Sequence, residues 1–112
     1  MTFTIRKDDA KDVVMVGVDG QLIVGNRHDL KQKVLDALES GERKFIVDFS
    51  RTGYIDSSGL GVLVSLQKKI RDVDGDLRLS GLNDDLHTLF ELTKLDTLFT
   101  IVDSAEDALA AF

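Results

Sequence analysis

The chain has 112 residues, 43% of them apolar, with a formal net charge of −6 at pH 7 and no cysteine. This length fits one domain over residues 1–112, and the apolar blocks between charged turns are typical of a folded chain. The missing cysteines exclude disulfides and thiolate metal ligands, and the acidic surface argues against nucleic acid as a partner.

The N-terminal segment MTFTIRKDDAKD lacks the basic start and the apolar run of a signal peptide. No apolar stretch in the chain approaches the roughly 20 residues that a membrane span needs. We therefore expect a cytoplasmic protein that does not enter a membrane.

The first third of the chain predicts a hairpin followed by a helix. Residues 3–7 (FTIRK) and 13–18 (VVMVGV) have strand composition, and the charged segment DDAKD is a natural connection between them. Asn26 or Asp29 could cap the following helix, and Gly41 lies where a left-handed terminal residue belongs. The apolar stripe of this helix consists of Leu30, Val34, Ala37 and Leu38.

The middle of the chain predicts a buried strand and a long helix. Residues 44–49 (KFIVDF) form a short β-rich run, and the helix extends from near Ser58 to Asp72. Its first half is apolar on nearly all sides. We expect Leu63, Leu66 and Ile70 to face the sheet.

The last third repeats the alternation of strand and helix. DGDLRLSGL and TLFTIV predict strands, and Ser104 could cap a C-terminal helix. The inner face of that helix consists of Ala105, Ala108, Leu109 and Phe112. The helix before it has a stripe of Leu86, Leu89 and Phe90, with Leu92 as a further candidate. This order predicts an α/β domain with a mixed four- to five-stranded sheet and about four helices.

The segment YIDSSGLGVL, residues 54–63, lies between the middle strand and the long helix. A serine nucleophile would need a base, but His28 and His87 both fit a solvated helix surface better. They are also too far apart in sequence to indicate a metal site. The motif G-x-S-x-G and the glycine-rich nucleotide motifs are absent. We expect no catalytic, cofactor or metal site.

Two further interpretations of this segment remain. A serine just before an apolar helix could cap its free N–H groups. A cap does not explain Gly59 and Gly61, which cost up to about 1 kcal/mol each in a helix and suggest a close approach to the backbone. A hydroxyl at a helix N-terminus could instead carry a phosphoryl group, which would face N–H donors and the positive end of the helix dipole.

The segment IVDFSRTGYIDSSGLGVLVSLQKKI resembles the signature of bacterial anti-sigma factor antagonists, the STAS-domain proteins. Their pattern is an apolar strand, then D-S-[ST]-G-[apolar]-G and a helix. GQLIVGNRHDLKQKV is similar to the family's G-x-L turn and first helix, and LSGLNDDLHTLFELTKLDTLFTIVDS to its later helix and last strand. The resemblance therefore covers essentially the whole chain.

This resemblance implies a partner-switching regulator that is not an enzyme. In the family, the unmodified antagonist binds an anti-sigma factor that is also a serine-protein kinase, and so frees a sigma factor. The kinase phosphorylates the first serine after the aspartate, here Ser57, and a serine phosphatase restores the binding form. By the same correspondence, the expected partner-binding residues are Asp56, Ser57, Ser58, Gly59, Leu60, Gly61, Gln21 and Ile23.

The sequence departs from the family pattern at one place. Many relatives have an aspartate soon after the G-x-L turn, whereas this chain continues from Leu22 to Ile23, Val24 and Gly25. This difference bears on which kinase is the partner. The alternative within the same fold is a STAS module that is never phosphorylated, either a scaffold or an accessory module of a lipid or anion transporter.

Overall fold

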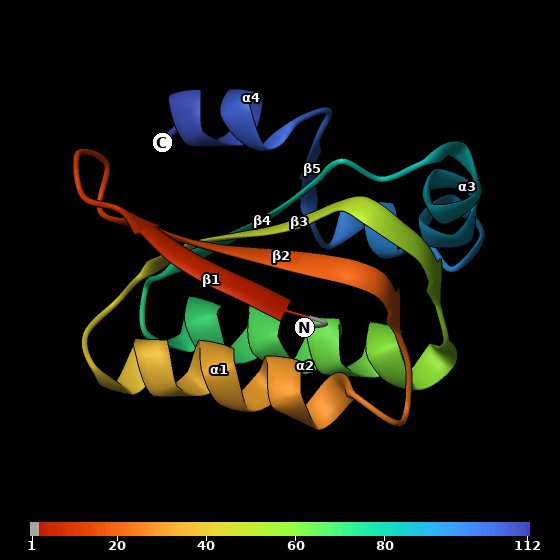
Figure 1. The fold of residues 1–112 in the computed structure, drawn as a ribbon, viewed down its shortest axis with the longest axis horizontal. Helices are drawn as coiled ribbons and strands as arrows, with labels where there is room; N and C mark the ends of the chain where they lie inside the picture. Colours follow the sequence, from red (N-terminus) through yellow and green to blue (C-terminus); the bar gives the residue numbers. More distant parts are fainter. Residues whose placement is uncertain (1–2) are drawn as a thin grey trace.

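The computed structural model describes residues 3–112 and contains one five-stranded sheet (Figure 1). The strand order follows the chain order, with β1 antiparallel to β2 and every other pair parallel. The predicted mixed sheet is therefore confirmed. The strands are β1 (Phe3–Asp8), β2 (Val13–Leu22), β3 (Lys44–Ile55), β4 (Asp76–Ser80) and β5 (Thr100–Val102).

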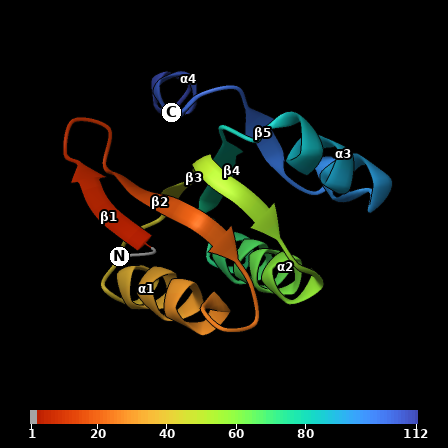
Figure 2. The same cartoon turned by 45° about the vertical axis from the view of Figure 1, so that its right-hand side comes forward.

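Four α-helices surround the sheet, as expected (Figure 2). Helices α1 and α2 lie next to each other on one face, and α4 lies on the opposite face in contact with β3, β4 and β5. Helix α3 and a short 3-10 helix, η1, lie near the edge formed by β5. The bounds are α1 (Arg27–Glu39), α2 (Ser57–Asp72), α3 (Asp84–Leu92), η1 (Leu95–Thr97) and α4 (Ala105–Ala110).

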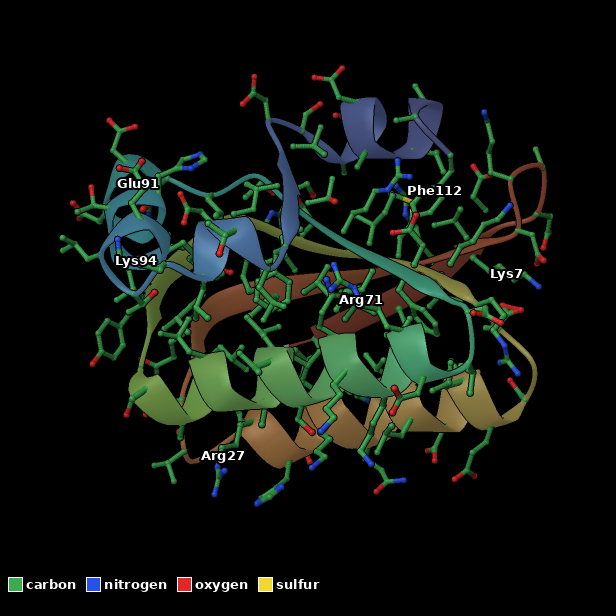
Figure 3. All side chains as sticks on the ribbon, turned by 180° about the vertical axis from the view of Figure 1, so that it is seen from behind. Lys7, Arg27, Arg71, Glu91, Lys94 and Phe112 are labelled. Atoms are coloured by element: carbon green, nitrogen blue, oxygen red, sulfur yellow. The ribbon has the colours of Figure 1, made fainter. Side chains whose placement is uncertain are left out.

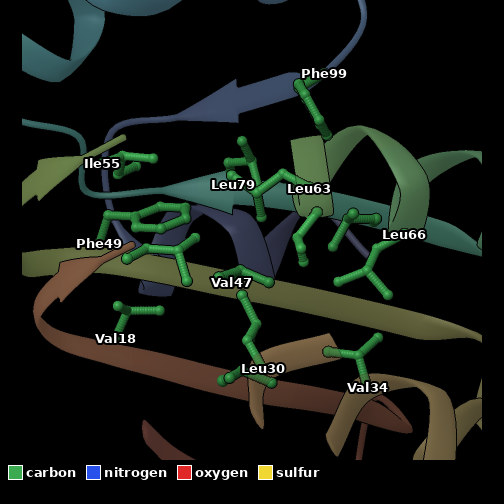
Figure 4. Packing of buried hydrophobic residues seen from close by; sticks show 14 of the residues in the cluster. Val18, Leu30, Val34, Val47, Phe49, Ile55, Leu63, Leu66, Leu79 and Phe99 are labelled. Carbon is green, nitrogen blue, oxygen red and sulfur yellow. The ribbon is translucent and has the colours of Figure 1, made fainter. Parts of the chain in front are cut away.

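The main core lies between the sheet and the pair α1 and α2 (Figure 4). Leu63, Leu66 and Ile70 of α2 are completely buried, which confirms that this side of the helix faces the sheet. Strand β3 contributes Phe45, Val47 and Phe49, also with no exposed surface. Burial of a large apolar side chain stabilises the fold by about 1.5–3 kcal/mol, so this layer holds α2 firmly.

A second, smaller cluster lies under α4. Ala108 packs there against Met15 and Ile46 on the other face of the sheet. Phe112, which follows the end of α4, also packs against this cluster, and the Arg78 guanidinium lies 3.9 Å from the centre of its ring (Figure 3). The C-terminal helix is thus fixed by a small apolar contact and a cation–π interaction.

Several element bounds differ from the prediction. Strand β2 continues to Leu22 and β3 to Ile55, because the polar segment after residue 49 still pairs with β2. Thr52 is buried there, and its hydroxyl donates to the Val18 carbonyl at 2.7 Å. The last strand is shorter than predicted, since Thr97 belongs to η1 and the N–H groups of Leu98 and Phe99 donate to the Leu95 carbonyl. Leu92 is 78% exposed and does not belong to the buried stripe of α3.

The helix ends agree with the sequence in part. Gly41 has a φ of +107°, and the Ser104 hydroxyl accepts from the N–H of Asp107, both as expected. Asn26 is the N-cap residue of α1, as one alternative expected, but its side chain makes no capping hydrogen bond and accepts from Ile23 N–H instead. Asp29, the other candidate, lies within the first turn. In the described part of the chain, no helix is both long and apolar enough to cross a membrane.

Candidate functional site

Two connections meet at the carboxyl ends of the neighbouring parallel strands β2 and β3. The first is the turn of residues 23–26 that leads into α1, and the second is the junction of β3 with α2 (Figure 1). Leu22 and Ile55 are paired in the sheet, and Asp56 N–H donates to the Leu22 carbonyl at 3.1 Å. The sheet therefore brings Gln21 and Ile23 close to the segment that begins at Asp56.

Asp56, and not a serine, caps α2. Its Oδ1 accepts from Gly59 N–H at 2.8 Å and from the Ser58 hydroxyl at 2.6 Å, while Ser57 is already the first residue of the helix. The interpretation of a serine as the helix cap, one of those left open, is therefore wrong. An aspartate at this position satisfies a free N–H group and places negative charge at the positive end of the helix dipole.

The second oxygen of Asp56 reaches the other connection. Oδ2 accepts from Val24 N–H at 3.0 Å. The hydrogen bond from the Ser58 hydroxyl, followed by those from Gly59 and Val24 N–H, lowers the pKa of Asp56 below its ordinary value, because all of them favour the charged form. Asp56 is thus an ionised carboxylate that joins two segments far apart in sequence.

The two serines of the segment have different surroundings. The Ser58 side chain is half-buried, and its hydroxyl proton is directed to Asp56. Ser57 is exposed, and its hydroxyl has no hydrogen-bond partner within residues 3–112. Of the two hydroxyls, only that of Ser57 is both exposed to solvent and without a hydrogen bond in the described part of the chain.

The two glycines also differ. A Cβ atom on Gly59 would lie 2.6 Å from the Leu22 carbonyl oxygen, so the close approach expected there comes from the chain itself. Gly61 is exposed and has nothing from the chain itself within 4 Å of such an atom, so no part of this chain requires a glycine there and a close approach by a partner stays a prediction. Gly59 and Leu60 are buried, whereas Gly61 remains accessible.

The turn before α1 presents a residue that the sequence analysis did not single out. Gln21 is exposed and Ile23 is half-buried, but Val24 is 63% exposed and directly joined to Asp56. An apolar residue next to glycine in a predicted turn was the available signal. Only the contact with Asp56 shows that it belongs to this site.

A hollow of about 380 Å³ opens beside Ser57. Tyr54, which is 57% exposed, lies on one side of it, and Asp85 and Leu89 of α3 lie on the other. Neither His28 nor His87 is among the residues that line it. The hollow thus combines apolar walls, two carboxylates, the phenol of Tyr54 and the hydroxyl of Ser57, with no histidine among the lining residues to act as a base for the serine.

Comparison with known families assigns this arrangement to a class. Residues 4–108 match the family model of the STAS domain. The chain therefore belongs to the STAS-domain family. This assignment agrees with the observed sheet order, and with the D-S-S-G segment at the start of α2.

Individual relatives give the same picture. The chain is 32% identical over 108 residues to BtrV of Bordetella bronchiseptica, named as a candidate anti-sigma factor antagonist, with 89% of this chain and 93% of that protein covered. It is 31% identical to the anti-sigma-B factor antagonist of Staphylococcus aureus, with coverage of 81% and 84%. The crystal structure of TM1081 from Thermotoga maritima, also described as a candidate antagonist, superimposes with a TM-score of 0.90 at 31% identity, with coverage of 97% and 92%.

Proposed function

We propose that this protein is an anti-sigma factor antagonist controlled by phosphorylation of Ser57. The unmodified protein binds an anti-sigma factor that is also a serine-protein kinase, and so frees a sigma factor for transcription. Phosphorylation on Ser57 releases the partner, and a serine phosphatase restores the binding form. The names of the relatives support the antagonist role, and the exposed, uncommitted hydroxyl of Ser57 is the observation that supports the switch.

In this proposal the chain is the substrate of the chemistry and not an enzyme. The kinase transfers the γ-phosphoryl group of ATP to Ser57 Oγ and releases ADP, and the hydroxyl proton passes to a base of the kinase. Ser57 at the surface suits such a transfer, because the kinase must reach its oxygen in line with the phosphate. The proposed place of action is the cytoplasm, where ATP and sigma factors are available.

Phosphorylation would change the surface and leave the fold in place. The group adds a charge of about −1.5 to −2 at neutral pH, next to the ionised Asp56. The helix dipole offsets part of this repulsion, by about 0.3–1 kcal/mol at an exposed site. The offset is limited because Asp56 already accepts from Gly59 N–H. A partner surface that fits a small hydroxyl would then meet a bulky dianion, and such a mismatch can weaken the free energy of binding by several kcal/mol.

The proposal is tested by label transfer from ATP. The purified kinase whose gene neighbours this one is incubated with labelled ATP and the protein, and the modified residue is mapped by mass spectrometry. We expect one labelled site, lost in Ser57→Ala and kept in the matched control Ser58→Ala. Label that maps to Ser58 would show that the choice of serine is wrong. A protein that takes up no label would favour the alternative, an unphosphorylated scaffold or transporter module.

A further inference from the structure

The turn of residues 23–26 is held together from within. Asn26 Oδ1 accepts from Ile23 N–H at 2.9 Å, and Asn26 Nδ2 donates to the Gln21 carbonyl at 2.8 Å. The Ile23 carbonyl also accepts from Asn26 N–H and Arg27 N–H. These bonds fix the shape of the turn, but none of them sets where the turn lies relative to α2.

One side chain connects the turn to α2. Asp56 directs Oδ1 to Gly59 N–H and Ser58 Oγ, and Oδ2 to Val24 N–H. A carboxylate can accept on both oxygens at once, whereas serine, threonine and the amide of asparagine offer only one acceptor oxygen. Capping alone requires only one such oxygen, so the second bond is a separate property of aspartate at this position.

We propose that Asp56 is a positioning residue, which holds the exposed Val24 side chain beside Ser57 so that both contact the same partner. This inference rests on the proposed function, since it names a second contact at that site. Val24 is 63% exposed, and its N–H donates to Asp56, the residue that precedes Ser57. In a chain with a net charge of −6, an exposed valine at this position offers a partner an apolar contact close to the start of α2.

The partner that fits this site has an apolar contact surface opposite Val24. Aromatic and aliphatic side chains at the centre of an interface contribute most when the contact excludes water, and a contact in the wrong place contributes little. Asp56 therefore acts on affinity through Val24, although its own carboxylate is turned toward the chain. We infer that the partner bound at Val24 is the kinase-type anti-sigma factor of the proposed function.

The first test measures the position of the turn without any partner. In Asp56→Asn the single acceptor oxygen can still cap Gly59 N–H, but an amide N–H₂ group then faces Val24 N–H. We expect the Val24 amide proton to exchange with solvent about tenfold faster than in the unaltered protein, as for a local opening. The amide of Leu86, which Asn83 caps on α3, serves as an internal control and should not change.

Asp56→Ser is the second variant, since its hydroxyl can cap α2 but cannot reach both donors. If the Val24 amide keeps its protection in folded Asp56→Asn and Asp56→Ser, the positioning role is wrong. A loss of protection at both Val24 and Leu86 would indicate general loosening of the domain and would also contradict the inference.

The second test is a double-mutant cycle of binding to the purified neighbouring kinase. Val24→Ser keeps the backbone N–H and removes the apolar contact, so we expect about tenfold weaker binding, which corresponds to about 1.4 kcal/mol. Asp56→Asn should weaken binding to a similar extent. Because both changes act through the same contact, the double variant should bind about as weakly as either single one. Independent, additive losses would contradict the inference.

The two tests separate this inference from the proposed function. Ser104→Ala, which removes the cap of α4 far from the site, is the control for loss of a helix cap and should bind normally. If the unaltered protein does not bind the kinase, the proposed function fails, and the contact role of Val24 fails with it. If the protein binds and is labelled on Ser57 but the cycle is additive, only the present inference fails.

Discussion

The two halves of α2 contrast sharply in what surrounds them. From Leu63 to Ile70 the inner side of the helix is sealed against the sheet, with no exposed surface on its large apolar residues. At the other end, Ser57 and Gly61 are open to solvent, and Asp56 accepts the hydrogen bonds from Ser58 and Gly59 in the first turn. The helix is therefore anchored along its length and accessible at its start.

Under the proposed function, this contrast would let phosphorylation of Ser57 change binding without disturbing the fold. Burial supplies most of the stability of a domain, and most of it lies at least one turn away from Ser57. Changes in the first turn should then alter binding far more than folding. Changes in the buried half should do the reverse. The predictions below test this separation from both sides.

Leu63→Ala should produce the largest loss of stability. Leu63 is completely buried between α2 and the sheet, and its truncation leaves a cavity that neighbouring elements can fill only in part. We expect the free energy of unfolding to fall by about 2–5 kcal/mol in denaturant titrations. A loss below about 1 kcal/mol would show that the buried half of α2 is not the anchor described above.

Substitution of the two glycines in the first turns of α2 should have the next largest effect on the free energy of unfolding. Gly59→Ala forces a Cβ against the Leu22 carbonyl oxygen and should cost about 1–3 kcal/mol through displacement of the end of β2. Gly61→Ala meets no atom and should stabilise the helix by up to about 1 kcal/mol. Thermal unfolding of both variants measures the difference. Equal effects would contradict the packing at Gly59.

The stability of the first turn should depend on pH through Asp56. Its pKa is lower in the folded protein than in the unfolded chain, so its contribution is present above the ordinary aspartate pKa. That contribution is lost as the pH falls through the folded value. Asp56→Asn should therefore lose less stability than the unaltered protein between neutral pH and about pH 3. Parallel curves for the two proteins would show that the carboxylate charge contributes nothing.

The smallest effect is expected for Ser57→Ala. The hydroxyl is exposed and has no partner in the described part of the chain, so its removal should change the free energy of unfolding by less than about 0.5 kcal/mol. Ser58→Ala, which removes a hydrogen bond to Asp56, should cost more than Ser57→Ala. Urea titrations of the two variants test this order, and the reverse order would contradict the assignment of the free hydroxyl.

Much of the fold could be predicted from sequence, because its elements follow from apolar periodicity. The order of strands and helices, the buried side of α2 and the cap at Ser104 were all correct. The C-terminal ends of β2 and β3 were missed. In β3, the residues after position 49 are mostly polar and contain Gly53. Their pairing depends on the neighbouring strand, which local composition does not show.

The position of the D-S-S-G motif in the fold was predictable, and the contacts of its residues were not. The motif located Asp56 and Ser57 correctly at the start of α2, but it could not show that Asp56 takes the role of cap. It also gave no indication of the contact between Asp56 and Val24, which are 32 positions apart. Such contacts arise only when parallel strands bring their following turns together at one edge of the sheet.

The most direct test of the switch compares two forms of the same protein. The unmodified protein and the protein phosphorylated on Ser57, verified by mass spectrometry, are titrated against the purified neighbouring kinase, and both are also melted alone. We expect the phosphorylated form to bind more than a hundredfold more weakly, corresponding to a loss of about 3 kcal/mol. Its melting temperature should remain within a few degrees of the unmodified one. Equal affinity of the two forms, or unfolding of the phosphorylated domain, would contradict the account.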